Sequence, residues 1–322
     1  MENSSYVLIT PARNERENIE RTIRSVAAQS LLPRKWIIVS DGSTDGTDEI
    51  VKTYVPRYPF IELVRAGNGD KYNFGSKVHA FNAGYASLGG TEYDYIGNLD
   101  ADITFQNDYF ERLLVKMNGN GKLGLAGGMV SEFLENGLIH ADYNINSVAG
   151  AVQMFRRRCF DEIGGYLPLR FGGIDAVAEV MARMHGWQVR SFQDLIVHHH
   201  GRIGISEKGV LSARWRFGKR DYSMGMHPLF MLLKSISRFR EKPYVIGSMF
   251  MMGGYMWSLM RNARVSIPRD VLEYTRREQI GRIIFSVKHN TAWKVLFRGN
   301  DGGLGCYSEQ PAEDYKLPPK KN

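Results

Sequence analysis

The sequence predicts an α/β domain built on a parallel sheet, followed by a mainly helical region of opposite charge. In the first two thirds, short apolar runs alternate with segments of helical periodicity, as in a sheet whose strands are connected by helices. From about residue 208 the apolar spacing is mainly helical. Residues 1–200 hold 20 Lys and Arg against 24 Asp and Glu, a net −4, and residues 201–322 hold 22 against 10, a net +12. We therefore expect two surfaces with different partners.

Seven apolar runs are expected to be strands: Tyr6–Thr10, Trp36–Ser40, Ile61–Val64, Tyr93–Leu99, Gly124–Val130, Gly150–Phe155 and Gln188–Phe192. Four segments are expected to be helices: Glu15–Gln29, Asp45–Tyr54, Ser76–Ser87 and Asp175–His185. The expected domains are a catalytic domain over 1–205, a helical basic region over 206–310 and a loose tail over 311–322.

The composition fits a globular protein of a reducing compartment. Of the 322 residues, 43% are hydrophobic and 24% are charged, which argues against wholesale disorder. The two cysteines, Cys159 and Cys306, form neither a disulfide framework nor a zinc-ligand spacing. The polar, acidic start and the short apolar run before Pro11 differ from a signal peptide, so we expect a cytoplasmic protein. The basic residues are scattered among apolar stretches without a nucleic-acid motif, so nucleic acid is not an expected partner.

Polar clusters follow three of the predicted strands, at Pro11–Glu15, Asp41–Asp45 and Asp100–Asp102. In open parallel sheets, ligands bind at the carboxyl ends of the strands. Asp100 and Asp102 can share one hard cation, Mg²⁺ or Mn²⁺, that would neutralise a departing diphosphate; the alternative is a solvated turn. Asp41 can accept a hydrogen bond from a nucleobase imide, with the loop amides near phosphate, and the same loop also fits a turn that leads into a helix.

The segments Thr10–Glu15, Ser40–Asp45 and Leu99–Asp102 resemble, in this order, the signatures of family 2 glycosyltransferases. The resemblance covers roughly residues 5–200, and Gly75–Gly84 resembles the segment between these signatures. It implies the GT-A fold, a Rossmann-like nucleotide-diphospho-sugar transferase fold that uses a divalent metal. It also implies inversion at the anomeric carbon by a single displacement.

The resemblance assigns roles to individual residues. The donor-binding residues that it implies are Pro11, Ala12, Arg13, Glu15, Asp41, Ser43, Lys77, Asp100 and Ala101. It implies Asp102 and Asp100 as metal ligands, with a third ligand from His199 or His200, and a surface histidine cluster is the alternative. It implies Asp175 as the general base that takes the acceptor's proton, although Ile174 stands where the family often has a glutamate. A cap of the following helix is the alternative for Asp175.

On the acceptor side the resemblance points to Gly150, Gly173 and Trp215. Glycines would let the backbone approach the donor sugar. Trp215 is interpreted as a sugar-stacking platform or, equally, as a core or interface aromatic. The segment Tyr244–Met260 has 17 residues without a charge and basic residues on both sides. It is short of the roughly 20 residues of a spanning helix. The alternatives are an interfacial membrane segment, a buried core helix or dimer interface, and a span, and the basic surroundings favour the first.

The expected function is therefore an inverting glycosyltransferase that moves a sugar from a nucleotide-sugar donor to a hydroxyl acceptor. Family habit favours a UDP-sugar, and a lipid-linked saccharide in cell-surface polysaccharide assembly is the expected acceptor, at the inner face of the cell membrane. One alternative is a catalytically silent, membrane-associated scaffold with the same fold. Another is a sugar nucleotidyltransferase, which would carry a Gly-rich basic loop where this chain has Pro11–Glu15.

Overall fold

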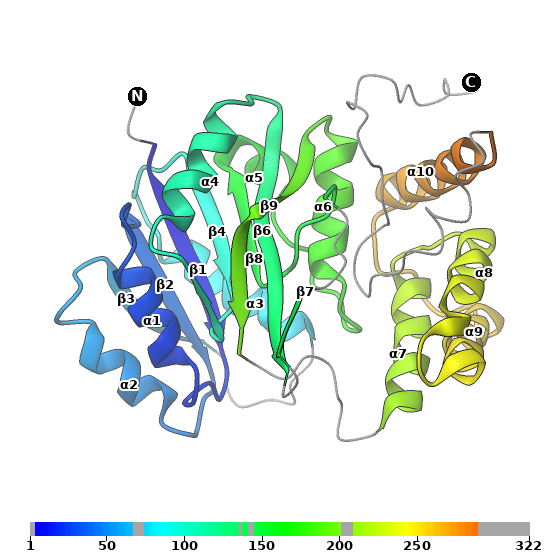
Figure 1. The fold of residues 1–322 in the computed structure, drawn as a ribbon, viewed down its shortest axis with the longest axis horizontal. Coiled ribbons are helices and arrows are strands. Elements are labelled where there is room, and N and C mark those ends of the chain that lie inside the picture. Colours follow the sequence, from blue (N-terminus) through cyan, green and yellow to red (C-terminus); the bar gives the residue numbers. More distant parts are fainter. Residues whose placement is uncertain (1–3, 67–73, 135–136, 141–144, 201–208, 289–322) are drawn as a thin grey trace. The chain divides into compact units, whose positions relative to one another are not determined.

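The computed structural model describes residues 4–66, 74–134, 137–140, 145–200 and 209–288. The chain divides into two compact units, the first formed by residues 1–170 and 174–201 and the second by residues 171–173 and 202–322. Figure 1 shows the sheet and helices of the first unit in blue to green and the helices of the second in yellow-green to orange. The predicted tail at 311–322 lies outside the described residues.

The first unit is a nine-stranded sheet with helices packed against it (Figure 1). Its strands are β1 (Tyr6–Ala12), β2 (Lys35–Asp41), β3 (Ile61–Ala66), β4 (Tyr95–Leu99), β5 (Ile103–Phe105), β6 (Leu123–Leu134), β7 (Gly137–His140), β8 (Val152–Arg156) and β9 (Gln188–His199). Its helices are α1 (Ile19–Ala27), α2 (Thr47–Tyr54), α3 (Phe74–Ala86), α4 (Tyr109–Asn118), α5 (Arg157–Ile163) and α6 (Ile174–Met184). The strand order is β3-β2-β1-β4-β8-β6-β9-β5, and β7 pairs with β6.

The sheet is parallel in one half and mixed in the other. β3, β2, β1 and β4 run parallel, as the alternation of strands and helices predicted. Beyond β4 the prediction of a parallel sheet holds only in part, because β8 runs antiparallel to both β4 and β6, whereas β6 and β9 run parallel. An antiparallel strand begins at the edge where its neighbour ends. The residues before β8 therefore lie beside the carboxyl end of β4, and the Asp100 N–H donates to the Ala151 carbonyl at 2.9 Å.

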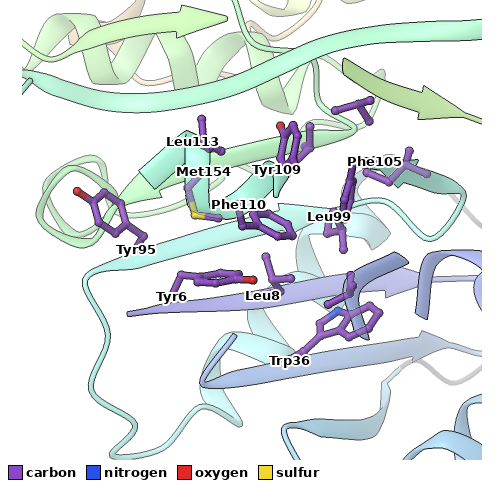
Figure 2. Packing of buried hydrophobic residues seen from close by; sticks show 14 of the residues in the cluster. Tyr6, Leu8, Trp36, Tyr95, Leu99, Phe105, Tyr109, Phe110, Leu113 and Met154 are labelled. Atoms are coloured by element: carbon purple, nitrogen blue, oxygen red, sulfur yellow. The ribbon is translucent and has the colours of Figure 1, made fainter. Parts of the chain in front are cut away.

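The core explains why the first strands are continuous apolar runs. Tyr6 and Leu8 of β1 belong to a buried cluster with residues of α1 and α4, and the rings of Tyr6 and Phe110 lie 4.8 Å apart (Figure 2). On the opposite face, Ile9 packs against α3 so closely that a Cβ on Gly84 would come within 2.7 Å of its side chain. Strands covered on both faces carry apolar residues at successive positions rather than at alternate ones.

All of the predicted strands and helices occur, with ends shifted by a few residues. The helix predicted from Glu15 begins at Ile19, because a turn precedes it in which the Asn18 N–H donates to the Glu15 carbonyl. The strand predicted over Gln188–Phe192 continues to His199. Four elements were not predicted, namely β5, α4, β7 and α5.

The second unit is helical, as predicted. Its described elements are α7 (Val210–Ser223), α8 (Pro228–Ser237), η1 (Arg238–Arg240), α9 (Tyr244–Met260) and α10 (Arg269–Lys288). Helices α7 and α9 cross closely at two glycines, because a Cβ on Gly218 would collide with the Met251 carbonyl and one on Gly254 with the Trp215 carbonyl. Asp221 is fully buried and pairs with Lys234 at 2.8 Å, and burial lowers the pKa of Lys234 to about 8.

The segment Tyr244–Met260 forms the whole of α9. Its small residues face inward, with Gly247, Ser248 and Gly254 buried, whereas large apolar side chains such as Met249 and Met260 are 64% and 69% exposed. Within the described ranges, no helix combines the length and the apolarity that crossing a bilayer requires.

Candidate active site

Two loops at the carboxyl ends of β1 and β2 are tied together by hydrogen bonds. Pro11 and Ala12 end β1 in register with Val39 and Ser40 of β2. The next residue but one, Asn14, has a positive φ of 57°, a conformation that asparagine adopts more readily than most residues.

This turn holds the second loop at several points. The Asn14 N–H donates to the Ser43 hydroxyl at 3.1 Å, and the Thr44 N–H donates to the Asn14 side chain at 2.9 Å. The Arg16 N–H donates to the Asp45 carboxylate at 3.0 Å. The predicted donor residue Ser43 therefore joins the two loops.

Arg13 and Asp41 come from these two loops and meet at the same edge of the sheet. Their side chains approach to 3.5 Å, between Nη1 and Oδ2, and both are largely buried. A carboxylate has about four acceptor positions, so Asp41 can accept further hydrogen bonds while it is paired with Arg13. The pair fits the recognition of a planar base with an imide N–H.

The residues after β4 lie at the neighbouring strand end. The Asp100 carboxylate forms an ion pair with Lys77 of α3. Ala101 is buried, and its carbonyl accepts a hydrogen bond from the Thr22 hydroxyl at 2.8 Å, which fixes the backbone between the two aspartates. This fixed turn orients Asp100 and Asp102.

The side chain of His199, rather than that of His200, lies beside the Asp102 carboxylate, although the His200 N–H donates to the Asp102 carbonyl at 2.8 Å. The distance from His199 Nε2 to Asp102 Oδ2 is 3.2 Å, and both side chains are mostly buried. His200 Nε2 is instead 2.8 Å from the Thr104 hydroxyl. Burial lowers the pKa of His200, and burial together with the nearby Asp100 carboxylate raises the pKa of Asp102.

Glu15 brings the first loop into the same electrostatic environment. Its pKa is raised to about 7, mainly by burial, and the charges of Asp102 and Asp100 add to this effect while His199 opposes it. These four side chains come from segments up to 184 residues apart in the sequence. The fold therefore gathers three acidic groups and an imidazole at the carboxyl ends of β1, β4 and β9.

The donor chemistry of this group fits a divalent cation. Among the described residues, no three His, Cys, Asp or Glu side chains stand close enough to form a ready-made metal cluster. Asp102 and His199 are nevertheless in contact, and Asp100 is close enough to raise the pKa of Asp102. Carboxylate oxygens with one imidazole are ligands that Mn²⁺ accepts, and Mg²⁺ prefers the oxygens.

Asp175 lies in the first turn of α6, against the backbone before β8. A Cβ on Gly150 would come within 2.8 Å of Asp175 Oδ2 and 3.2 Å of its Cγ, so the carboxylate occupies the space that a side chain would need. The Gly150 carbonyl accepts from the Asn98 side chain at 2.9 Å. The predicted base and the predicted acceptor-side glycine are thus in contact.

A buried polar network of side chains that were not predicted as site residues supports this end of the site. Tyr166 donates to the Gln153 side chain at 2.8 Å, and burial raises its pKa, with smaller contributions from Asp175 and Asp100. Glu179 accepts from the Val148 N–H at 2.8 Å, and burial raises its pKa to about 7. No sequence signal distinguishes Glu179 from an exposed glutamate. The charges of Asp175 and Asp100 both add to the raised pKa of Tyr166, so this network lies near both carboxylates.

The remaining predicted residues, Gly173 and Trp215, belong to the second unit. Gly173 has a positive φ of 85° and packs directly against Met224. Trp215 of α7 packs over Gly253 of α9, where a Cβ would come within 2.9 Å of its ring. Trp215 thus packs where these two helices meet, and its ring lies 6.4 Å from that of Trp257.

A sequence model of glycosyl transferase family 2 matches residues 7–177, which is more than half of the chain. The chain belongs to glycosyl transferase family 2. The matched range contains the loops after β1, β2 and β4 and ends just after Asp175. The resemblance inferred from the sequence motifs is confirmed, and the membership argues against a sugar nucleotidyltransferase.

The glycosyltransferase AglE of Haloferax volcanii is 26% identical over 235 residues, 68% of this chain and 73% of that protein. The 4,4'-diaponeurosporenoate glycosyltransferase of Staphylococcus aureus is 31% identical over 122 residues, 38% of this chain and 30% of that protein. The poly-beta-1,6-N-acetyl-D-glucosamine synthase of Staphylococcus epidermidis is 30% identical over 117 residues, 36% of this chain and 26% of that protein. In these two staphylococcal relatives the match therefore spans less than a third of their length.

The fold resembles a solved structure of mannosyltransferase PcManGT from Pyrobaculum calidifontis in complex with GDP-Man and Mn²⁺. The TM-score is 0.50 at 15% identity, and the match covers 91% of this chain and 85% of the other. At this identity the likeness concerns the fold alone. The GT-A fold with a helical C-terminal region is thus confirmed for this chain.

Proposed function

We propose that this family 2 glycosyltransferase transfers a sugar, with inversion, from a nucleoside-diphosphate sugar to a hydroxyl of a lipid-linked saccharide in cell-surface polysaccharide assembly. The observation that carries the proposal is the convergence of acidic groups on one sheet edge. Asp102 lies 3.2 Å from His199, and Asp100 is paired with Lys77. Asp175 lies against Gly150, whose carbonyl accepts a hydrogen bond from Asn98 at the end of β4. Metal-site, donor-site and base candidates from distant segments therefore share one environment.

The donor nucleotide would lie against the two linked loops. The Asp41 carboxylate would accept the imide N–H of the base, and Arg13 would hold that carboxylate in place. Uracil and guanine both present such an N–H. The family resemblance favours a UDP-sugar, whereas the structural relative was solved with GDP-Man, so both nucleotides belong in the test.

Asp100, Asp102 and His199 would hold Mg²⁺ or Mn²⁺, which supplies neutralisation of the charge that develops on the leaving diphosphate. Lys77, paired with Asp100, places a second positive charge at this edge of the sheet. The ion pair also keeps the Asp100 carboxylate oriented without the cation. Both positive charges favour departure of the diphosphate over its return.

Asp175 would act as the general base. As the acceptor oxygen forms its bond to the anomeric carbon, the bond from that carbon to the diphosphate oxygen breaks, and the acceptor proton moves to the Asp175 carboxylate. Gly150 makes room for this carboxylate because it has no side chain. Asn98 fixes Gly150 through its carbonyl, so the position of the base follows from the end of β4.

Association with the inner face of the membrane is part of this proposal. Residues 201–322 carry a net charge of +12, which would be attracted to anionic lipid. A lipid-linked acceptor would place the reaction at that surface.

The first experiment is a thermal-shift panel of UDP, GDP, CDP and ADP with and without Mn²⁺. A ligand at a hundredfold excess over its dissociation constant stabilises a protein by about 2.7 kcal/mol, so one nucleotide is expected to raise the Tm in the presence of Mn²⁺ only. Asp102→Ala is expected to abolish that shift, and Asp161→Asn on the exposed face of α5 is expected to keep it. A panel without any shift would favour the catalytically silent scaffold.

The second experiment tests Asp175 as the general base. Asp175→Asn is expected to bind the nucleotide as the wild type does and to lower the transfer rate at least about a hundredfold, the usual effect of removing a general base. Wild-type turnover in this variant would refute the assignment of Asp175.

A further inference from the structure

The segment Ser147–Ala151, which leads into β8, has a hydrogen bond at each of its five carbonyls. Two of these bonds come from the end of β4, where the Asp100 N–H donates to the Ala151 carbonyl and the Asn98 side chain to the Gly150 carbonyl, both at 2.9 Å. The position of the segment is therefore set relative to the metal-site loop, Asp100–Asp102. The other three carbonyls accept hydrogen bonds from Ser191, Gln153 and Val152.

Glu179 of α6 holds the beginning of the same segment. Its Oε1 atom accepts from the Val148 N–H at 2.8 Å and from the Ser147 hydroxyl at 3.0 Å. Its other oxygen, Oε2, lies 3.6 Å from Arg183 Nη1. Glu179 is only 2% exposed, so bulk water does not compete for these contacts. A buried carboxylate that is held at both oxygens has a fixed position, and it fixes the backbone that donates to it.

Asp175 stands one helical turn before Glu179 on α6. Residues four apart lie on the same face of a helix, and both carboxylates contact the segment: Glu179 at Val148, and Asp175 at Gly150. Burial raises the pKa of Glu179, and the charge of Asp175 adds to this effect, which agrees with their proximity. The helix that carries the predicted base is thus bonded, through Glu179, to the segment that Asp100 also holds.

We propose that Glu179 is a positioning residue for glycosyl transfer, which fixes the segment Ser147–Ala151 and so sets the place of the Asp175 carboxylate relative to the metal-site loop. The inference rests on the proposed function, in which Asp175 takes the acceptor's proton. Without an acceptor at residue 179, the buried Val148 N–H would be unpaired, and a shift of the segment against α6 would relieve this. Since a displacement of about 1 Å at a reacting group costs on the order of a hundredfold in rate, such a shift lowers kcat.

The test compares Glu179→Met with Glu179→Gln in the full chain. The probe is the release of nucleoside diphosphate, with Mn²⁺, from UDP-glucose, UDP-N-acetylglucosamine or GDP-mannose, whichever the wild type uses fastest. Glu179→Met has no oxygen atom and is expected to lower kcat between about tenfold and a hundredfold, with an unchanged KM for the donor. Glu179→Gln keeps an oxygen that can accept from the Val148 N–H, so it is expected to restore most of kcat. An equal loss of kcat in both variants would overturn the role of these hydrogen bonds.

A double variant tests whether Glu179 acts through the base. When Asp175 is already replaced by asparagine, no base remains for Glu179 to position. Glu179→Met/Asp175→Asn is therefore expected to release nucleotide as slowly as Asp175→Asn alone. A further tenfold loss in the double variant would show that Glu179 acts on another part of the protein, which would overturn the proposal.

Glu278 is the matched control for the loss of a buried glutamate. It is 6% exposed and pairs with an arginine four residues later, Arg282, at 2.7 Å, as Glu179 does with Arg183. Glu278→Met is expected to lower the Tm, as Glu179→Met does, and to keep the wild-type kcat. A similar loss of kcat in both variants would assign the effect to lower stability and overturn the positioning role.

Hydrogen exchange distinguishes a failure of this inference from a failure of the proposed function. The amides of Val148, Val152 and Asp100 all donate to Glu179 or to the segment. In Glu179→Met they are expected to exchange at least about tenfold faster than in the wild type or in Glu278→Met, because the segment would open more often. Wild-type exchange at all three amides would overturn the proposal. Faster exchange in a protein that releases no nucleotide from any of the three donors would uphold Glu179 as the anchor of the segment and refute the glycosyl transfer alone.

Discussion

Replacing Gly150 by alanine is expected to lower the kcat of glycosyl transfer between about tenfold and a hundredfold while donor binding stays unchanged. The Cβ of the alanine would lie 2.8 Å from Asp175 Oδ2 and 3.2 Å from both Cβ and Cγ of that side chain, whereas ordinary contact begins at 3.4 Å. The whole carboxylate must therefore move by about 0.6 Å, and a displacement of about 1 Å at a reacting group costs on the order of a hundredfold in rate. The Gly150 carbonyl, which holds Asn98, is retained in alanine.

The assay compares kcat, the KM for the donor and the Mn²⁺-dependent Kd for the nucleotide in the wild type and in the variant. Gly121→Ala is the matched control, because a Cβ at Gly121 would meet no atom within 4 Å. A folded Gly150→Ala protein with wild-type kcat would show that the position of Asp175 does not limit the reaction. A loss confined to donor affinity would place Gly150 at the donor instead.

Two further predictions concern stability. Burial raises the pKa of Glu179 from its ordinary value of 4.5 to about 7. The folded protein therefore holds this proton more tightly than the unfolded chain does, which contributes roughly 3 kcal/mol to the free energy of unfolding below about pH 4.5. This contribution is lost as the pH rises to about 7. Glu179→Gln is expected to flatten this part of the pH profile in denaturant titrations, unlike the exposed control Glu49→Gln, and an unchanged profile would contradict the burial argument. Gly218→Ala is expected to destabilise the second unit by at least about 1–3 kcal/mol, because its Cβ would collide with the Met251 carbonyl in the α7–α9 crossing. Thermal unfolding alongside Gly121→Ala measures this, and equal Tm values for both variants would refute the close crossing.

The parallel half of the sheet could be predicted because its strands are buried on both faces and its helices have clear apolar stripes. The direction of β8 could not, since strand direction depends on tertiary pairing and not on the composition of the strand. Short elements were missed for a related reason. The seven residues of α5 cover barely two turns, and the three residues of β5 show no alternation, so neither carries a periodic signal.

The sequence motifs identified residue types for the site but not their pairing. The choice between His199 and His200 depends on where β9 ends, because successive strand residues point to opposite faces and His200 lies beyond the last of them. The contact of Gly150 with Asp175 depends on the antiparallel entry of β8.

Under the proposal that the turn at Asn14 and the loop at Ser43 hold the donor nucleotide, the hydrogen bonds between them bear on how the donor preference can change. Each loop supplies acceptors or donors that the other needs, so a substitution in one leaves a polar group in the other without its partner. The two loops are therefore expected to tolerate replacement by the loops of a relative only when both are replaced together. Grafting the second loop of a relative with another nucleotide preference should succeed only when the first loop is grafted with it, and the specificity of such enzymes should shift in paired steps.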